Sequence, residues 1–479
     1  MKLSPELLSV LRRTLLGTAI AITLIALFVT EENWRGDRAW AGVERDLKAR
    51  GELRSETAAL SPPIPDEQNF FKTPLLNRLL YNRPDDIERK KFLVETRFRE
   101  FRVLHNQLIS SRDFSAIRSL LRKRGFFTAP DSSSPVLDLL LTLEPLRPLL
   151  DEVRDAASSR PQAALQLEFS PSSPFASSVD LNFAIGLGVI LATRADLELE
   201  LGKITEAHAD VVALLRLGDG LAAPSESATF MSLRAGISAY ENAAPIIARG
   251  RERHLWNESQ LAAIERLLGQ LRPLPTVQAA RRYERALFIS LVDAGPRWDP
   301  ENFQWPFWFF HGLAQQNKVA YSRAIDRDLL SAITFAPDRI LSRPPKLRLA
   351  TQSWLSPDGT VARLRHPYSW LSEMAFLDLD RILQDLGYSI DRLALLRISC
   401  AFERHRLAVG AFPEKLDDLV PRFLPAIPTG IFDGQSLQLR KTPEGGSEIY
   451  FFGRDGRDNQ GTGDDPVLKI SPVSGSGSH

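Results

Sequence analysis

The stretch TLLGTAIAITLIALFVT, residues 14–30, decides the architecture of this chain, because none of its seventeen residues carries a charge. A helix needs roughly 17 to 25 apolar residues to cross the hydrocarbon core of a bilayer, so the stretch predicts a transmembrane helix. The charged residues that flank it are Lys2, Arg12 and Arg13 before it and Glu31 and Glu32 after it. The positive-inside rule then predicts an anchor in the inner (cytoplasmic) membrane, with a cytoplasmic N-terminus and a periplasmic or extracytoplasmic body.

A cleaved signal peptide is the alternative interpretation of this N-terminus. Such a peptide ends in small residues, whereas this run ends in Leu27-Phe28-Val29-Thr30 and continues into a charged segment of helical composition. We expect one helix that begins at Ser4-Pro5-Glu6, continues past the membrane as a stalk and ends at Gly51. Trp34 and Trp40 are expected near the outer membrane interface.

Composition narrows the classes of function. The 479 residues exceed what one core usually holds, so two or three domains are expected. Sixty basic residues balance 59 acidic ones, which leaves no net field to attract nucleic acid. The single cysteine, Cys400, excludes an intramolecular disulfide and a cysteine-based zinc site, and we expect it to be a small buried apolar residue.

The chain is predicted to be mainly α-helical and to divide into five parts. These are residues 1–51 (anchor and stalk), 52–69 (proline-rich linker), 70–388 (an irregular helical bundle or solenoid), 389–470 (a small α+β module) and 471–479 (a disordered tail). Helical patterns in the body are clearest at residues 85–110, at 181–201 before Gly202, and at 260–271, and a further helix is expected to open at Ser134-Pro135. No alternating pattern of apolar and polar residues long enough to indicate a strand occurs in the body.

Two stretches of the body leave alternatives open. Residues 194–218 resemble one tetratricopeptide unit, with Gly202 at the turn and Ala207 beneath it, but Glu241 stands where the next unit needs a small residue. An ordinary helical hairpin is therefore the alternative. The run FQWPFWFF, residues 303–310, is predicted to be a buried plug, a membrane-surface contact or a binding groove.

Catalytic motifs are not found in the sequence. It contains no HExxH pair of metal-binding histidines, no phosphate-binding P-loop and no G-x-S-x-G nucleophile turn. Paired acids such as Glu198 and Glu200 lie two residues apart, do not share a helix face and are expected to be solvated. An envelope hydrolase whose site is assembled from scattered helical residues remains the alternative class of function.

The C-terminal part carries the most specific pattern. An amphipathic helix over residues 393–409 ends at Gly410, a short helix is expected at 414–420, and two strands are expected at 437–441 and 448–452. Within this order stand the segments 401–406 (AFERHR), 410–413 (GAFP), 432–434 (FDG) and 453–458 (GRDGRD). This part resembles the C-terminal globular domain of the major pseudopilin of type II secretion systems. The overall layout is also similar to that of a group of membrane-anchored bacterial proteins, which implies no particular function.

The pseudopilin resemblance implies a calcium site in an acidic loop. The candidate ligands are Asp455, Asp458, Asn459, Asp464 and Asp465, which alternate with glycines. Calcium takes six to eight oxygen ligands in flexible geometry, so such a loop suits it, and a solvated acidic turn is the alternative. The expected protein is thus a membrane-anchored extracytoplasmic scaffold or interaction protein, related to secretion or the envelope, with other envelope proteins as partners and no nucleic acid.

Overall fold

The computed structural model describes most of the chain. The described residues are 5–53, 64–81, 86–126, 132–165, 179–225, 228–271, 273–294, 311–326, 333–336, 339–342, 368, 379–431, 434, 437–443, 446–453 and 457–470. They form a mainly helical protein with a long apolar N-terminal helix and a small three-stranded sheet, which confirms the predicted class.

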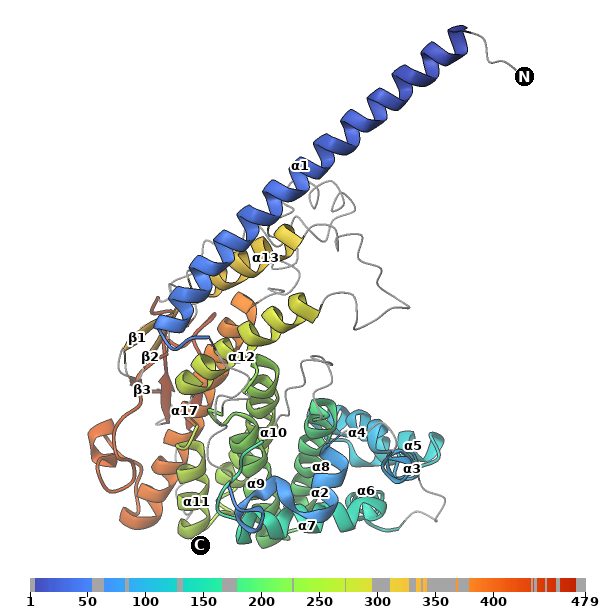
Figure 1. The fold of residues 1–479 in the computed structure, drawn as a ribbon. Coiled ribbons are helices and arrows are strands. Elements are labelled where there is room, and N and C mark those ends of the chain that lie inside the picture. Colours follow the sequence, from blue (N-terminus) through green and yellow to red (C-terminus); the bar gives the residue numbers. More distant parts are fainter. Residues whose placement is uncertain are drawn as a thin grey trace, which may run out of the picture.

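The N-terminal helix α1 (Pro5–Ala49) runs without a break through the predicted span and stalk. Gly51, with a φ of 64°, ends it as predicted, because glycine adopts the left-handed conformation without a steric cost. By length and composition α1 can cross a membrane, and its apolar window is not buried among the residues that the structure describes. Figure 1 shows this half extending away from the body.

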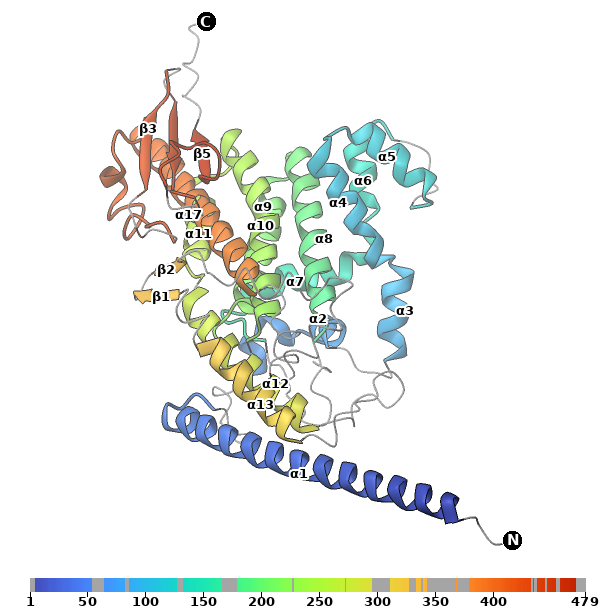
Figure 2. The same cartoon turned by 90° about the horizontal axis from the view of Figure 1, so that it is seen from above.

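The second half of α1 lies against the body. It packs along α13 (His311–Ala324), which in turn packs on α12 (Pro273–Ala294) (Figure 2). The predicted stalk therefore packs on α13, which lies more than 260 residues later in the chain. Most of the predicted linker, residues 54–63, lies outside the described residues.

Three long helices form the centre of the body. They are α8 (Leu181–Glu200), α9 (Ile204–Leu221) and α10 (Phe230–Glu252). The Asp180 side chain caps α8 by accepting a hydrogen bond from Phe183 N, and Gly202, with a φ of 74°, makes the tight turn into α9 that the sequence predicted. Nearly every residue of α8 is buried. Its first part, up to Ala192, is accordingly apolar on almost all sides, whereas its last part carries buried charged residues such as Arg194 and Asp196.

Shorter helices cover the outer side of this centre (Figure 2). They are α2 (Pro74–Leu80), α3 (Ile87–Glu95), α4 (Phe101–Ser110), α5 (Phe114–Lys123), α6 (Pro135–Leu141) and α7 (Arg147–Ser159). Ser134 caps α6 as predicted, by accepting a hydrogen bond from Leu137 N.

The single helix predicted over residues 85–110 is wrong, because the chain breaks there into α3 and α4. Arg97 adopts a φ of 53° at the break. The break lets Phe98 stack on Phe183 with ring centroids 4.7 Å apart, beside Gly186. A Cβ atom at Gly186 would lie 2.7 Å from the Phe98 ring, so this glycine permits close packing. Tertiary packing has overridden the local helical pattern.

The body also contains a two-stranded hairpin, which the sequence did not indicate. Strand β1 (Ile333–Ala336) pairs antiparallel with β2 (Arg339–Ser342), with Ile333 opposite Ser342. The two strands are separated by only two residues, Pro337 and Asp338, which is typical of a hairpin. Each strand is only four residues long, too short for a search by alternation to detect reliably.

The C-terminal part contains the predicted helix and hairpin, with additions. Helix α17 (Leu379–Val409) begins earlier than expected and packs on α10 and on α11 (Glu258–Leu268). The expected helix at 414–420 is only a 3-10 turn, Leu416–Leu419. Strands β3 (Gln438–Lys441) and β4 (Ser447–Tyr450) form the predicted hairpin, and β5 (Val467–Ile470), which was not predicted, pairs with β4.

Candidate functional site at the junction of anchor and body

The contact between α1 and α13 begins directly after the predicted membrane span. Gly36 and Gly312 lie at the crossing, and a Cβ atom on either would overlap with the backbone of the other helix. The Asn33 side chain accepts a hydrogen bond of 2.7 Å from Gly312 N. Two backbones in direct contact leave no room for sliding, so the crossing fixes the position of α13 along α1.

Polar and aromatic side chains support this crossing. His311 Nε2 lies 2.9 Å from Asp37 Oδ1. The Lys318 ammonium group donates to Asp293 and lies 4.5 Å from the centre of the Trp40 ring, in cation–π geometry. The second predicted interfacial aromatic, Trp34, remains exposed beside the end of the span. Trp40 therefore belongs to the junction, whereas Trp34 is free to contact a bilayer.

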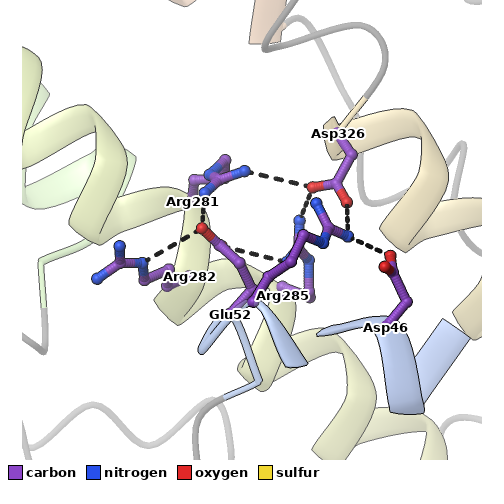
Figure 3. A network of polar contacts seen from close by, with 7 residues as sticks. Asp46, Glu52, Arg281, Arg282, Arg285 and Asp326 are labelled. Carbon is purple, nitrogen blue, oxygen red and sulfur yellow. Dashed lines mark hydrogen bonds and ion pairs between the residues drawn. The ribbon is translucent and has the colours of Figure 1, made fainter. Parts of the chain in front are cut away.

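A network of ion pairs connects the C-terminal end of α1 to the body. Figure 3 shows the carboxylates of Glu52 and Asp326 surrounded by guanidinium groups. Arg281 donates to Glu52 at 2.5 Å and to Asp326 at 3.3 Å. Arg285 contacts the same two carboxylates, and Arg50 lies 2.8 Å from Asp326. The network thus joins the end of α1 to both α12 and α13.

Burial determines how much this network contributes. Arg285 is fully buried, and this burial lowers the pKa of its guanidinium group, although both neighbouring carboxylates oppose the shift. A buried ion that loses its partner costs about 3 to 5 kcal/mol, so Asp326 and Glu52 are required where Arg285 is present. Two outer pairs complete the network, Arg282 with Glu52 at 3.7 Å and Arg50 with Asp46 at 2.7 Å.

A second buried charge cluster joins α7, α8 and α9. Asp210 is fully buried and accepts hydrogen bonds from Arg154 Nε at 2.8 Å and Arg194 Nε at 2.6 Å. Glu198 accepts two hydrogen bonds from Arg154, at 2.9 and 3.1 Å, so its predicted solvation is wrong. Burial, aided by the charge of Asp210, raises the pKa of Glu198 to about 7.

The carboxylates of Asp210 and Glu198 are bridged by arginine side chains and do not face each other across an open cleft. Such an arrangement stabilises the packing of three helices and leaves little carboxylate surface for a substrate. Cys400 is buried as predicted, and burial raises the pKa of its thiol to about 12, which keeps it protonated and unreactive. His254 Nδ1 lies 2.7 Å from Glu403 Oε1 and thereby joins α17 to the end of α10.

The predicted calcium ligands are only partly described. Asp455 lies outside the described residues. Asp465 is buried, and its carboxylate accepts hydrogen bonds from the backbone nitrogens of Gly453 (2.8 Å), Asn459 (2.9 Å) and Gly461 (3.1 Å). A carboxylate that accepts three backbone N–H groups has most of its acceptor sites occupied by the loop itself, so Asp465 fits a structural role better than that of a metal ligand.

The remaining acidic side chains of this loop have other partners. Asp458 accepts a hydrogen bond from Gln460 N at 2.8 Å, the geometry of an Asx turn. Asp464 and Asn459 have polar contacts of their own. Within the described residues, no group of three or more histidine, cysteine, aspartate or glutamate side chains is placed to hold a metal ion. Calcium therefore stays a prediction that depends on Asp458, Asn459 and Asp464, together with Asp455.

Sequence reasoning missed the charge network at the junction. The sequence RRYER, residues 281–285, could have indicated this network. It places Arg281 and Arg285 four residues apart on one face of α12, and the same face carries the buried residues Val277 and Phe288. Cations on an apolar helix face indicate buried ion pairs. The aromatic run 303–310, which directly precedes α13, lies outside the described residues, and so does the tail 471–479.

Comparison with known proteins gives no match, whether with family models, curated proteins or solved structures. The pseudopilin resemblance thus rests on the C-terminal residues quoted above.

Proposed function

We propose that the protein is a single-pass membrane-anchored scaffold of the bacterial envelope, which holds partner proteins at a fixed position beside the inner membrane. The observation that carries this proposal is the continuity of α1 from an exposed apolar half into a half that is locked to the body. The charge asymmetry of Arg12 and Arg13 against Glu31 and Glu32 supports a cytoplasmic N-terminus and a periplasmic body.

The dimensions of α1 support a body that lies against the membrane surface. Residues 14–30 extend about 26 Å as a helix, close to the thickness of a hydrocarbon core. Asn33, which bonds to Gly312, follows Thr30 by three residues, or about 4.5 Å along the axis. The ion pair of Arg50 with Asp326 follows about 25 Å further along the helix axis. Two contacts that are this far apart restrain both the tilt and the rotation of the body relative to α1.

The finer parts of the proposal concern the C-terminal module. The order of α17, loop, hairpin and acidic loop supports a pseudopilin-like domain, with calcium as its stabilising ion and a role related to secretion. The hydrolase alternative would need acids that converge on open space. Glu198 and Asp210 instead face Arg154 and Arg194, an arrangement that favours the scaffold.

Single-cysteine labelling tests the topology. Because Cys400 is buried, the unmodified protein should react little with a membrane-impermeant maleimide and serves as the control. In spheroplasts, Lys123→Cys on the body should be labelled, whereas Ser9→Cys before the span should be labelled only after permeabilisation. The opposite pattern, or a protein that washes off the membrane, would contradict the anchored scaffold.

Site-specific crosslinking tests the scaffold role itself. A photo-reactive residue on the body should crosslink the same envelope protein in native membranes of independent preparations. That crosslink should weaken when Asp326→Ala loosens the junction, although the anchor remains in the membrane. An equally strong crosslink from a body released from the membrane would show that anchoring is irrelevant to the interaction.

A further inference from the structure

A groove of about 530 Å³ opens between α11, α17 and the segment 421–425. Four arginines line it, Arg266 from α11, Arg397 and Arg404 from α17, and Arg422 from the segment. The chain as a whole is almost neutral, with a formal charge of +1, so this gathering is a local excess. It lies on the body, remote in sequence from the anchor.

Two of the four arginines are paired within the protein. Arg397 Nε lies 2.7 Å from Glu265 Oε1, and Arg404 lies 2.9 Å from Glu258 Oε1. Arg266 and Arg422 are exposed and have no carboxylate partner in the part of the chain that the structure describes. The groove therefore presents two unneutralised guanidinium groups from two different elements.

Three of the four arginine side chains have contacts that hold them in place. Arg397 lies over Gly269, where a Cβ atom would approach its guanidinium carbon to 2.8 Å. Arg404 Nη1 donates to the Phe423 carbonyl oxygen at 3.1 Å. The Phe423 ring lies 5.6 Å from the Arg404 guanidinium and 5.1 Å from that of Arg422. Held guanidinium groups lose less entropy when they bind a ligand.

We propose that this groove binds an acidic peptide segment of a partner protein. Guanidinium groups bind carboxylates through paired hydrogen bonds, and Arg266 and Arg422 offer two such sites from two different elements that line the groove. Phe423 and the prolines Pro421 and Pro425 provide apolar contact for the peptide between its acids. A volume of this size is in the range of ligand sites, and its open form suits an extended chain.

This inference rests on the proposed scaffold function and deepens it by naming a class of partner. The two are tested separately, because peptide binding is measured on full-length protein in detergent and topology is measured in spheroplasts. Failure of peptide binding with correct topology would remove only the groove assignment. Reversed topology would remove the envelope scaffold, whatever the peptide does.

The test uses fluorescence anisotropy of a labelled octaglutamate peptide with full-length protein. We expect one saturable site whose affinity falls as salt is added. The double variant R266Q/R422Q should bind at least about tenfold more weakly, since both free guanidinium groups are lost. Both side chains are exposed, so the variant should melt like the parent protein.

A charge-matched control separates the groove from general attraction. R147Q/R234Q removes the same charge at two other surface positions, where the arginines pair with Glu144 and Glu241, and it should bind the peptide as the parent does. Equal binding by R266Q/R422Q and the parent would overturn the proposal. Binding of pyrophosphate but not of the peptide, lost in R266Q/R422Q, would overturn the peptide assignment as well.

Discussion

The two halves of α1 share one helical backbone but differ in what surrounds them. In the first half, large apolar side chains such as Leu15 and Leu27 are more than 60% exposed. In the second half, Leu47 is fully buried and even the charged Glu32 is only 2% exposed. Helix formation alone therefore does not define the role of α1. The first half exposes apolar side chains and is long enough to cross a bilayer, whereas the second half is covered by the body.

The largest expected effect comes from placing charge in the exposed half. Ile22→Arg together with Ile25→Arg should cost about 5 to 7 kcal/mol of membrane insertion, at about 2.5 to 3.5 kcal/mol for each arginine near a helix centre. Both isoleucines are exposed, so the thermal midpoint of the body should not change. Carbonate extraction and thermal melting measure the two quantities.

Ile22→Leu with Ile25→Leu is the matched control for that experiment and should remain in the membrane. A fall in the thermal midpoint of the arginine variant would show that the first half also packs on protein. The contrast between the two halves would then disappear.

The second-largest effect is expected in the half of α1 that packs on the body. Asp326→Ala removes a partner of the buried Arg285 and of Arg281, and should lower the free energy of unfolding by about 3 to 5 kcal/mol. Membrane insertion should be unchanged. Asp46→Ala is the control, because this residue also pairs with Arg50 but is mostly exposed, and it should cost at most about 1 kcal/mol.

Denaturant unfolding of both variants in detergent measures this difference. If Asp326→Ala and Asp46→Ala were equally stable, the network would contribute no more than a surface ion pair. The second half of α1 would then be held mainly by the contact between Gly36 and Gly312.

The two halves also differ in how far the sequence predicts them. The span and the stop at Gly51 follow from local properties, namely apolar composition and the conformational freedom of glycine, and both are present in the structure. The docking of the second half depends on Gly312 and Arg285, which lie more than 230 residues from their partners. No local pattern encodes such a contact.

The same limit applies to the candidate sites. The hairpin of β3 and β4 was predictable because turn residues separate two strands. The burial of Glu198 was not predictable, because its arginine partner, Arg154, lies on another helix. The acidic loop was visible in the sequence, yet the role of Asp465 as an acceptor for three backbone N–H groups depends on how the loop folds.

A smaller effect is expected from pH, in a cluster away from α1. The pKa of Glu198 in the folded protein is raised to about 7, above its unfolded value near 4.3. The folded state therefore binds this proton more tightly, and its contribution to stability, at most about 3.7 kcal/mol, is present below pH 4 and is lost as the pH rises to 7.

Unfolding curves from pH 4.5 to 7 measure this dependence. Glu198→Gln should remove it, since glutamine does not titrate. The dependence should persist in the Asp326→Ala variant, because the junction and this cluster share no residue. Loss of the dependence in both variants would show that the clusters are coupled.

The smallest effect concerns calcium binding by the acidic loop, which the proposed topology places outside the cytoplasmic membrane. Extracellular calcium modules bind at about 10⁻⁴ to 10⁻³ M, which suffices outside the cytoplasmic membrane and is too weak inside it. A site of this kind should stabilise the folded protein by about 2.7 kcal/mol when calcium exceeds the dissociation constant a hundredfold. The full chain should then melt at a higher temperature in millimolar calcium than in chelator.

Two variants separate a calcium ligand from a residue that only shapes the loop. Asp458→Asn with Asp464→Asn should erase the difference between calcium and chelator, because the predicted site then loses two of its carboxylate ligands. Asp465→Asn should instead lower the midpoint in both buffers by a similar amount, because Asp465 accepts three backbone hydrogen bonds. Equal melting of the unmodified protein in both buffers would refute the calcium site and leave the loop as an acidic turn held by Asp465. In that case the position of the loop relative to the membrane would have no bearing on the stability of the C-terminal module.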